Sequence, residues 1–126
     1  MELRLVLTVD DVDEALAFYR DALGLPELEK WETTGDARIA ILDGGHATLE
    51  LVNEAQATAI DDVEVGSRVA GPLRIAIEVA DSPTLAARLV AAGAEQLAEP
   101  VLTPWNDLNI RLRTPDGLQL TLFTVQ

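Results

Sequence analysis

Polar side chains two or four positions apart occur in four stretches of the chain that are otherwise aliphatic. Because positions two apart on a strand point to the same face, each stretch predicts a polar row opposite an aliphatic one. Buried polar groups are costly unless they are paired, so these rows predict either a cavity that binds a small molecule or an internal network of ion pairs. The residues of this predicted site are Arg4, Thr8, Thr48, Glu50, Arg74, Glu78, Gln119 and Thr121.

Two arginines and one glutamate are the residues of this set that are best able to bind a charged ligand or take part in a reaction. Arg4 and Arg74 together could bind a carboxylate, phosphate or sulfate, because the guanidinium fork matches such anions. Alternatively, they pair with Glu50 and Glu78 inside the protein. Glu50 could act as a general base if burial made it more basic. A neighbouring arginine would have the opposite effect, which favours a salt bridge for Glu50.

Two tryptophans and the single histidine complete the candidates. Trp31 and Trp105 lie outside the aliphatic rows, which predicts that they form aromatic walls for a flat ligand or contacts at an interface. We expect Trp105, in a loop after Pro104, to bind the ligand. His46 directly follows a turn sequence, and we expect it on the surface.

The elements that must position these residues occur twice. Residues Leu3–Leu25 read as an alternating strand, an amphipathic helix and a glycine stop, and Leu73–Ala94 repeats this order. Asp11 is the expected N-cap of the first helix, and Ser82, followed by proline, that of the second. In each repeat we expect the helix to cover the aliphatic row of the preceding strand. The chain therefore predicts two copies of one module.

Three short strands follow each helix, which gives each module a β-α-β-β-β order. We expect an α+β fold in which both modules form one curved mixed sheet around a cavity. The single domain spans 1–126, with a first module at 1–53, an acidic linker at 54–72 and a second module at 73–126. The expected later strands are Glu27–Thr33, Ala37–Leu42, Ala47–Val52, Glu95–Leu102, Leu108–Arg113 and Leu118–Val125.

Composition excludes several classes of function. The formal net charge of −13 disfavours nucleic acid and anionic membrane surfaces, which bind clustered lysine and arginine. No apolar run reaches the roughly 18 to 20 residues that span a bilayer. The N-terminus lacks a secretory signal pattern, and the chain has no cysteine for disulfides or thiolate metal sites. We therefore expect a cytoplasmic protein that acts on a small molecule.

Three motifs give the chain a resemblance to a known superfamily. VDDVDEALAFYRDALGL near the start, LELV at the end of the first module and TPDGLQLTLF in the second resemble the vicinal oxygen chelate superfamily. That superfamily includes glyoxalase I, bleomycin resistance proteins and extradiol dioxygenases. The resemblance implies that four strand positions hold a metal in the metal-dependent members. Here these positions carry Arg4, Glu50, Arg74 and Thr121, a set unsuited to a divalent cation because arginine offers no lone pair.

The resemblance thus implies a member of the metal-free branch, typified by bleomycin resistance proteins. We expect a homodimer that uses no cofactor and sequesters a small organic ligand, anionic or aromatic, in its cavity. The alternative is a lyase or isomerase of the same superfamily, either metal-dependent through other ligands or with Glu50 as catalytic base. A third hypothesis is an interaction protein in which an arginine–glutamate network fills the cavity.

Overall fold

The first module forms the expected strand, helix and three strands in the computed structural model, which describes residues 1–22, 24–33 and 35–126. A short α-helix continues into a π-helical turn, η1. Asp11 caps this helix as expected, because its carboxylate accepts a hydrogen bond from the Glu14 amide at 3.0 Å. Leu23, near the expected helix end, lies outside the described residues. The elements are β1 (Glu2–Thr8), α1 (Val12–Leu16), η1 (Ala17–Ala22), β2 (Glu27–Glu32), β3 (Arg38–Asp43) and β4 (Ala47–Val52).

The second module repeats this order with two differences. Its second expected strand, Glu95–Leu102, is divided into two short strands on either side of Pro100, which has no amide hydrogen for a sheet ladder. Its helix begins at Ser82, and the N-cap is Asp81, whose carboxylate accepts from the Thr84 amide at 3.0 Å. The elements are β5 (Leu73–Glu78), α3 (Ser82–Ala91), β6 (Glu95–Gln96), β7 (Val101–Leu102), β8 (Asp107–Arg113) and β9 (Gln119–Val125).

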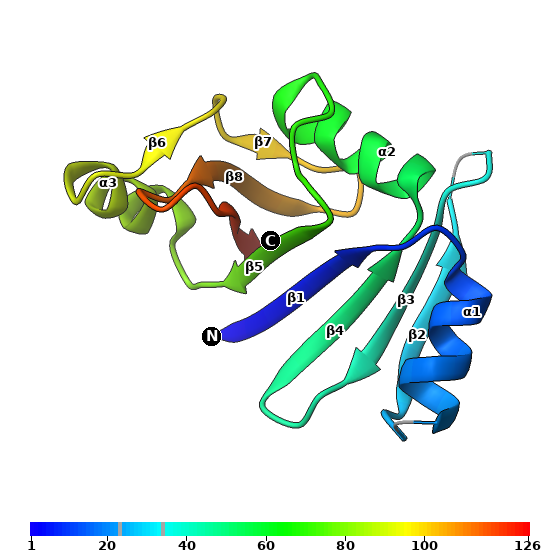
Figure 1. Ribbon diagram of the computed structural model, residues 1–126. Coiled ribbons are helices and arrows are strands. Elements are labelled where there is room, and N and C mark those ends of the chain that lie inside the picture. The colour runs from blue at the N-terminus through cyan, green and yellow to red at the C-terminus, as the bar shows by residue number, and fades with distance from the viewer. Residues whose placement is uncertain (23, 34) are drawn as a thin grey trace.

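The two modules share one mixed sheet. Its strand order is β2-β3-β4-β1-β5-β9-β8-β6, and β7 also pairs with β8. The central β1 and β5 are antiparallel, whereas the β1–β4 and β5–β9 pairs are parallel. Helices α1 and α3 lie on the outer side of the two halves (Figure 1). The α+β fold with a curved mixed sheet is therefore as expected.

The segment expected to be a linker contains a third helix, α2 (Glu54–Val65). Asn53 caps it by accepting a hydrogen bond from the Gln56 amide at 2.9 Å, and it ends at Gly66, whose positive φ of 81° suits glycine. The helix contacts β3 and β4 of the first module and β8 of the second (Figure 1). Its buried face includes Gln56, Asp61 and Glu64, so it lacks the aliphatic periodicity by which helices are predicted.

The helices cover less of the sheet than expected. Leu7 and Val9 pack against Val12 of α1, but Leu3 and Leu5 remain 43% and 37% exposed. The reason is that α1 contacts β3 and β4, and α3 contacts β6, β8 and β9. The middle of the sheet, where β1 meets β5, thus keeps an uncovered aliphatic face.

None of the helices in the described part of the chain is long and apolar enough to cross a bilayer.

Candidate ligand-binding cavity

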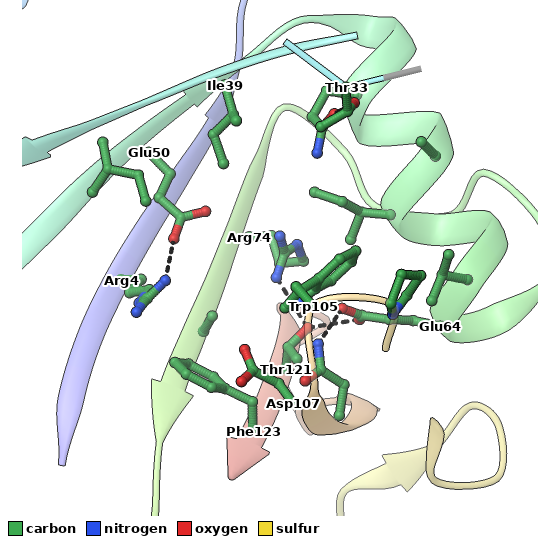
Figure 2. Close-up of a pocket in the computed structure, with 18 of the residues that line it drawn as sticks. Arg4, Thr33, Ile39, Glu50, Glu64, Arg74, Trp105, Asp107, Thr121 and Phe123 are labelled. Atoms are coloured by element: carbon green, nitrogen blue, oxygen red, sulfur yellow. Dashed lines mark hydrogen bonds and ion pairs between the residues drawn. The ribbon is translucent and has the colours of Figure 1, made fainter. Parts of the chain in front are cut away.

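A cavity of about 520 Å³ lies on the concave side of the sheet (Figure 2). Both modules line it, and α2 forms one of its walls through Ile60, Val63 and Glu64. Its volume falls in the range of about 300 to 1,000 Å³ that is usual for small-molecule sites. The protein therefore has both a cavity and an internal ion-pair network, so the hypothesis of a completely filled interior is wrong.

The structure brings together about half of the predicted site. Arg4, Glu50, Arg74, Trp105 and Thr121 line the cavity, and Trp31 joins them. Four predicted residues do not line it: Thr8, Thr48, Glu78 and Gln119. Gln119 accepts a hydrogen bond from Arg111 behind the cavity wall, and Thr8 lines a separate small pocket. Strand parity did not distinguish them from the lining residues: Thr8, Glu78 and Gln119 lie at the ends of their strands, and Thr48 is buried opposite Arg4 in the β1–β4 ladder.

Arg4 and Glu50 form an ion pair on one side of the cavity. Their Nη1 and Oε1 atoms are 3.0 Å apart, and the Glu50 side chain is only 8% exposed. The Arg4 guanidinium also stacks 4.8 Å from the centre of the Phe123 ring. Burial acts to lower the Arg4 pKa, but Glu50 and Glu2 outweigh it and raise the pKa above its usual value. Glu50 is thus held as the partner of a cation.

A second network, centred on Arg111, closes the cavity beside α2. Arg111 is fully buried, with Nη1 2.8 Å from Asp61 Oδ1 and Nη2 2.7 Å from Glu64 Oε2. Glu64 also accepts hydrogen bonds from Asn109 at 2.8 Å and from the Thr121 hydroxyl at 3.0 Å. This network ties α2 to β8 and β9.

Asp61 extends this network to the segment behind α2. It accepts from the amides of Val69 and Ala70 and pairs with Arg68 at 3.0 Å. Burial acts to raise the Asp61 pKa, but these amides and Arg111 lower it below its usual value. Sequence analysis placed Asp61 and Glu64 in an acidic surface linker, which is wrong because both are buried, and it overlooked Arg111. The available signal was the alternation in β8, where Asp107, Asn109 and Arg111 share one face.

Arg74 is an arginine of the cavity lining that takes part in none of these ion pairs. It is 7% exposed, and its Nη1 donates to the Thr121 hydroxyl at 3.0 Å. Among the described residues it forms an ion pair with none, so the expected alternative of pairing with Glu78 is wrong. Burial lowers its pKa, although Glu64 acts in the opposite direction. Arginine remains charged even so, and its guanidinium points into the cavity (Figure 2).

Asp107 is the corresponding unpaired carboxylate. It lies at the start of β8, is partly buried and lines the cavity. Within the described ranges no arginine or lysine forms an ion pair with it. Burial raises the pKa of the Asp107 carboxyl above its usual value; Arg4 and Trp105 lower it and Glu78 raises it further. Sequence analysis missed this residue because its position at a strand start resembles an ordinary surface turn.

The tryptophans lie at the rim of the cavity. Trp31 and Trp105 are 39% and 48% exposed, and both contribute to the lining, Trp31 from β2 and Trp105 from the loop between β7 and β8. They are well placed to contact the flat face of a ligand. His46 is exposed in the turn between β3 and β4, as expected.

The residues at the family's metal positions do not fit a divalent cation. Arg4 pairs with Glu50, and Arg74 donates to Thr121, so the positions form two closed contacts that include two positive charges. Only Glu50 is a good oxygen ligand. Nor do the described residues gather three or more histidine, aspartate or glutamate side chains elsewhere in a metal-binding arrangement.

Fold and site together define a protein built from paired βαβββ modules around a ligand cavity. The chain belongs to the Glyoxalase/Bleomycin resistance protein/Dioxygenase superfamily, whose family model matches residues 3–122. No curated protein matches the chain in sequence.

Solved structures with the same fold are similar over nearly the whole chain. A hypothetical protein from Bacillus halodurans C-125 is 20% identical with a TM-score of 0.72, covering 98% of this chain and 92% of its own. Methylmalonyl-CoA epimerase from Mycobacterium tuberculosis is 20% identical with a TM-score of 0.68, and the match covers 98% of this chain and 86% of the epimerase. Methylmalonyl-CoA epimerase from Streptomyces coelicolor, in complex with 2-nitronate-propionyl-CoA, is 24% identical with a TM-score of 0.66, and the match covers 97% of this chain and 92% of the epimerase. At these identities the likeness is one of fold.

Proposed function

We propose that this protein binds a small organic anion with a flat apolar body in its cavity. The observation that carries the proposal is Arg74, a buried guanidinium that points into the cavity without an ion-pair partner among the described residues. An unpaired buried cation is costly, and an anionic ligand would compensate it through charge-assisted hydrogen bonds. The aliphatic and aromatic lining, with two tryptophans at the rim, supports a flat apolar body.

The proposed mode of action is metal-free sequestration, without a cofactor. The residues at the family's metal positions support this, because two arginines there repel a divalent cation. Binding is favoured over turnover because Glu50, the candidate base, is engaged in an ion pair with Arg4. Turnover of a bound ligand that Glu50→Gln abolished would instead establish the enzymatic alternative.

The test uses benzoates with increasing 4-alkyl length, followed by tryptophan fluorescence and calorimetry. We expect the benzoates to bind and the matching neutral benzamides to bind at least about 10-fold more weakly, as a charge-assisted hydrogen bond requires. Arg74→Met should abolish benzoate binding, and Trp105→Ala should weaken it. Arg113→Met is the matched control, because Arg113 is exposed and pairs with Glu95 on the surface. Equal affinity for acids and amides, or retained binding by Arg74→Met, would overturn the proposal.

We also propose that the protein forms a homodimer through the uncovered face of β1 and β5. Facing one another in register on this side of the sheet are Leu3 and Ile77, Leu5 and Ile75, and Leu7 and Leu73. Leu3, Leu5 and Leu73 are exposed, whereas the other three pack partly against the cores of the two modules. The patch is aliphatic and uncharged in a molecule of net charge −13, so it is the surface on which two equally acidic copies can meet. A twofold interface brings the same patch together from both copies.

A further inference from the structure

Three charged groups that line the cavity have no ion-pair partner among the described residues, and two of them, of opposite sign, are buried or partly buried. Arg4 balances Glu50, while Arg68 and Arg111 balance Asp61 and Glu64. Arg74 and Asp107 remain, and each lines the cavity without an ion pair in the described chain. Glu29 also lines the cavity unpaired, but it lies on an exposed strand where water solvates it.

The surroundings of Asp107 are rich in acceptors. Asn109, two residues along β8, points to the same face and donates its amide NH₂ group to Glu64. That bond fixes the orientation of the amide and leaves its Oδ1 atom as a buried acceptor with no hydrogen-bond partner in the described part of the protein. A purely anionic ligand has no hydrogen-bond donor for these acceptors, and the negative charge of Asp107 would repel it.

We infer that the ligand is an extended zwitterion, whose anionic group binds Arg74 and whose ammonium group binds Asp107. This inference rests on the proposed function, since it takes Arg74 as the anion site. An ammonium ion would give Asp107 the ion-pair partner that it lacks among the described residues, in addition to the nearby Trp105 side chain and the positive charge of Arg4, which already act on its carboxyl.

The strand register sets the length of such a ligand. Arg74 donates to Thr121, which is opposite Arg111 in the β8–β9 ladder, whereas Asp107 is opposite Val125. Four residues along a strand correspond to about 13 Å, and side chains converge on the concave side, so the ligand's charges should be on the order of 10 Å apart. An α-amino acid, whose charges are adjacent, is too short. A benzoate with an aminoalkyl group in the 4-position has the required separation and flat body.

The experiment compares three probes of equal size by calorimetry on the intact protein: 4-(2-aminoethyl)benzoate, 4-propylbenzoate without the ammonium, and 2-(4-isopropylphenyl)ethylamine without the carboxylate. We expect the zwitterion to bind about 10- to 100-fold more tightly than either, the gain expected for one charge-assisted contact. Asp107→Asn should remove that advantage over 4-propylbenzoate. Glu99→Gln, outside the lining, is the charge control and should retain it, whereas Glu29→Gln tests the competing carboxylate at the exposed rim of the cavity.

The outcomes separate this inference from the proposed function. If 4-propylbenzoate binds through Arg74 as tightly as the zwitterion, or if Glu29→Gln rather than Asp107→Asn removes the advantage, the zwitterion inference is wrong and the anion site stands. If neither carboxylate binds, both are wrong. Retained folding of Asp107→Asn, checked by its thermal transition, makes a loss of affinity attributable to the site.

Discussion

At the scale of single residues, the site contains two buried arginines with opposite roles. Arg111 is surrounded by Asp61, Glu64 and Thr121, so its charge is compensated within the protein. Arg74 has one neutral acceptor and faces the cavity. The first arrangement holds the wall of the cavity in place, whereas the second keeps a positive charge available at a cost in stability, as binding sites commonly do.

This contrast predicts different effects for the same substitution. Arg111→Met should lower the free energy of unfolding by about 3–5 kcal/mol, because it leaves two buried carboxylates uncompensated. Arg74→Met should leave it unchanged or raise it, because an unpaired buried cation is replaced by an apolar side chain of similar length. Urea unfolding of the ligand-free proteins measures both. A loss for Arg74→Met as large as that for Arg111→Met would show that Arg74 is compensated internally.

The raised pKa of Asp107 predicts how its contribution to stability depends on pH. Because the folded protein holds this proton more tightly than the unfolded chain, Asp107 costs stability as pH rises through its folded pKa. Asp107→Asn should therefore have a higher melting temperature than the wild type at neutral pH. The difference should shrink as pH falls toward about 4, the usual carboxyl range.

A matched substitution should show the opposite sign. Hydrogen bonds from Arg20 lower the pKa of Asp21, so Asp21 contributes stability that is present above its unfolded pKa and is lost in acid. Asp21→Asn should therefore lower the melting temperature at neutral pH, with the difference vanishing at low pH. The same sign for both variants would contradict the assigned environment of Asp107.

At the scale of elements, α2 joins the two modules and forms one wall of the cavity. Its position depends on contacts at both of its ends. At the start, the Asn53 side chain accepts from the amides of Gln56 and of Arg38, which lies on β3. Toward the end, Asp61 and Glu64 are held by Arg111 of β8.

Removing the cap should therefore affect both stability and binding. Asn53→Ala should lower the free energy of unfolding by about 1–2 kcal/mol, the upper part of the usual range for an N-cap, because two amides lose their acceptor. Asn53→Asp keeps the oxygen that accepts from both amides and serves as the control, although it loses the donor to the Asp36 carbonyl. Urea unfolding measures the loss, and the affinity for 4-propylbenzoate should fall with it. Equal stability of the alanine and aspartate variants would show that the cap contributes nothing.

At the scale of the whole molecule, acidic residues outnumber basic ones by 22 to 9. Ion pairs in the described chain, such as the surface pairs of Arg38 with Asp13 and Arg113 with Glu95, involve six of the nine basic residues and leave an excess of negative charge. Salt weakens both the ion pairs and the repulsion, but the repulsion involves more groups. We therefore expect the melting temperature to rise as sodium chloride is added to a low-salt buffer. A steady fall would mean that the ion pairs dominate.

The proposed dimer makes a prediction at the same scale. Leu5→Glu places a charge in the middle of the uncovered β1–β5 face, where two copies would bring it together, and should convert a dimer into a monomer in sedimentation velocity experiments. Leu102→Glu is the control, because Leu102 is 60% exposed on β7, away from this face. A wild-type monomer, or a dimer that Leu5→Glu leaves intact, would contradict the proposed interface.

The sequence by itself was sufficient to predict the repeated module, the Asp11 cap, the strand parity and the proximity of Arg4 to Glu50. These features depend on local periodicity and on the repeat, which single-sequence patterns record directly. It was also sufficient to question a metal site, since that argument concerns only the chemistry of the residue types at four positions.

Only the tertiary structure decided which charges are compensated. Asp61 and Glu64 meet Arg111 about fifty residues away, on a helix whose buried face is polar and therefore has no hydrophobic period to detect. Whether Arg74 and Asp107 have ion-pair partners depends on the positions of all the other charged groups around them. Ion pairing is a property of distances between distant segments, so the composition of each strand could predict a polar cavity but not the two charges that remain available for a ligand.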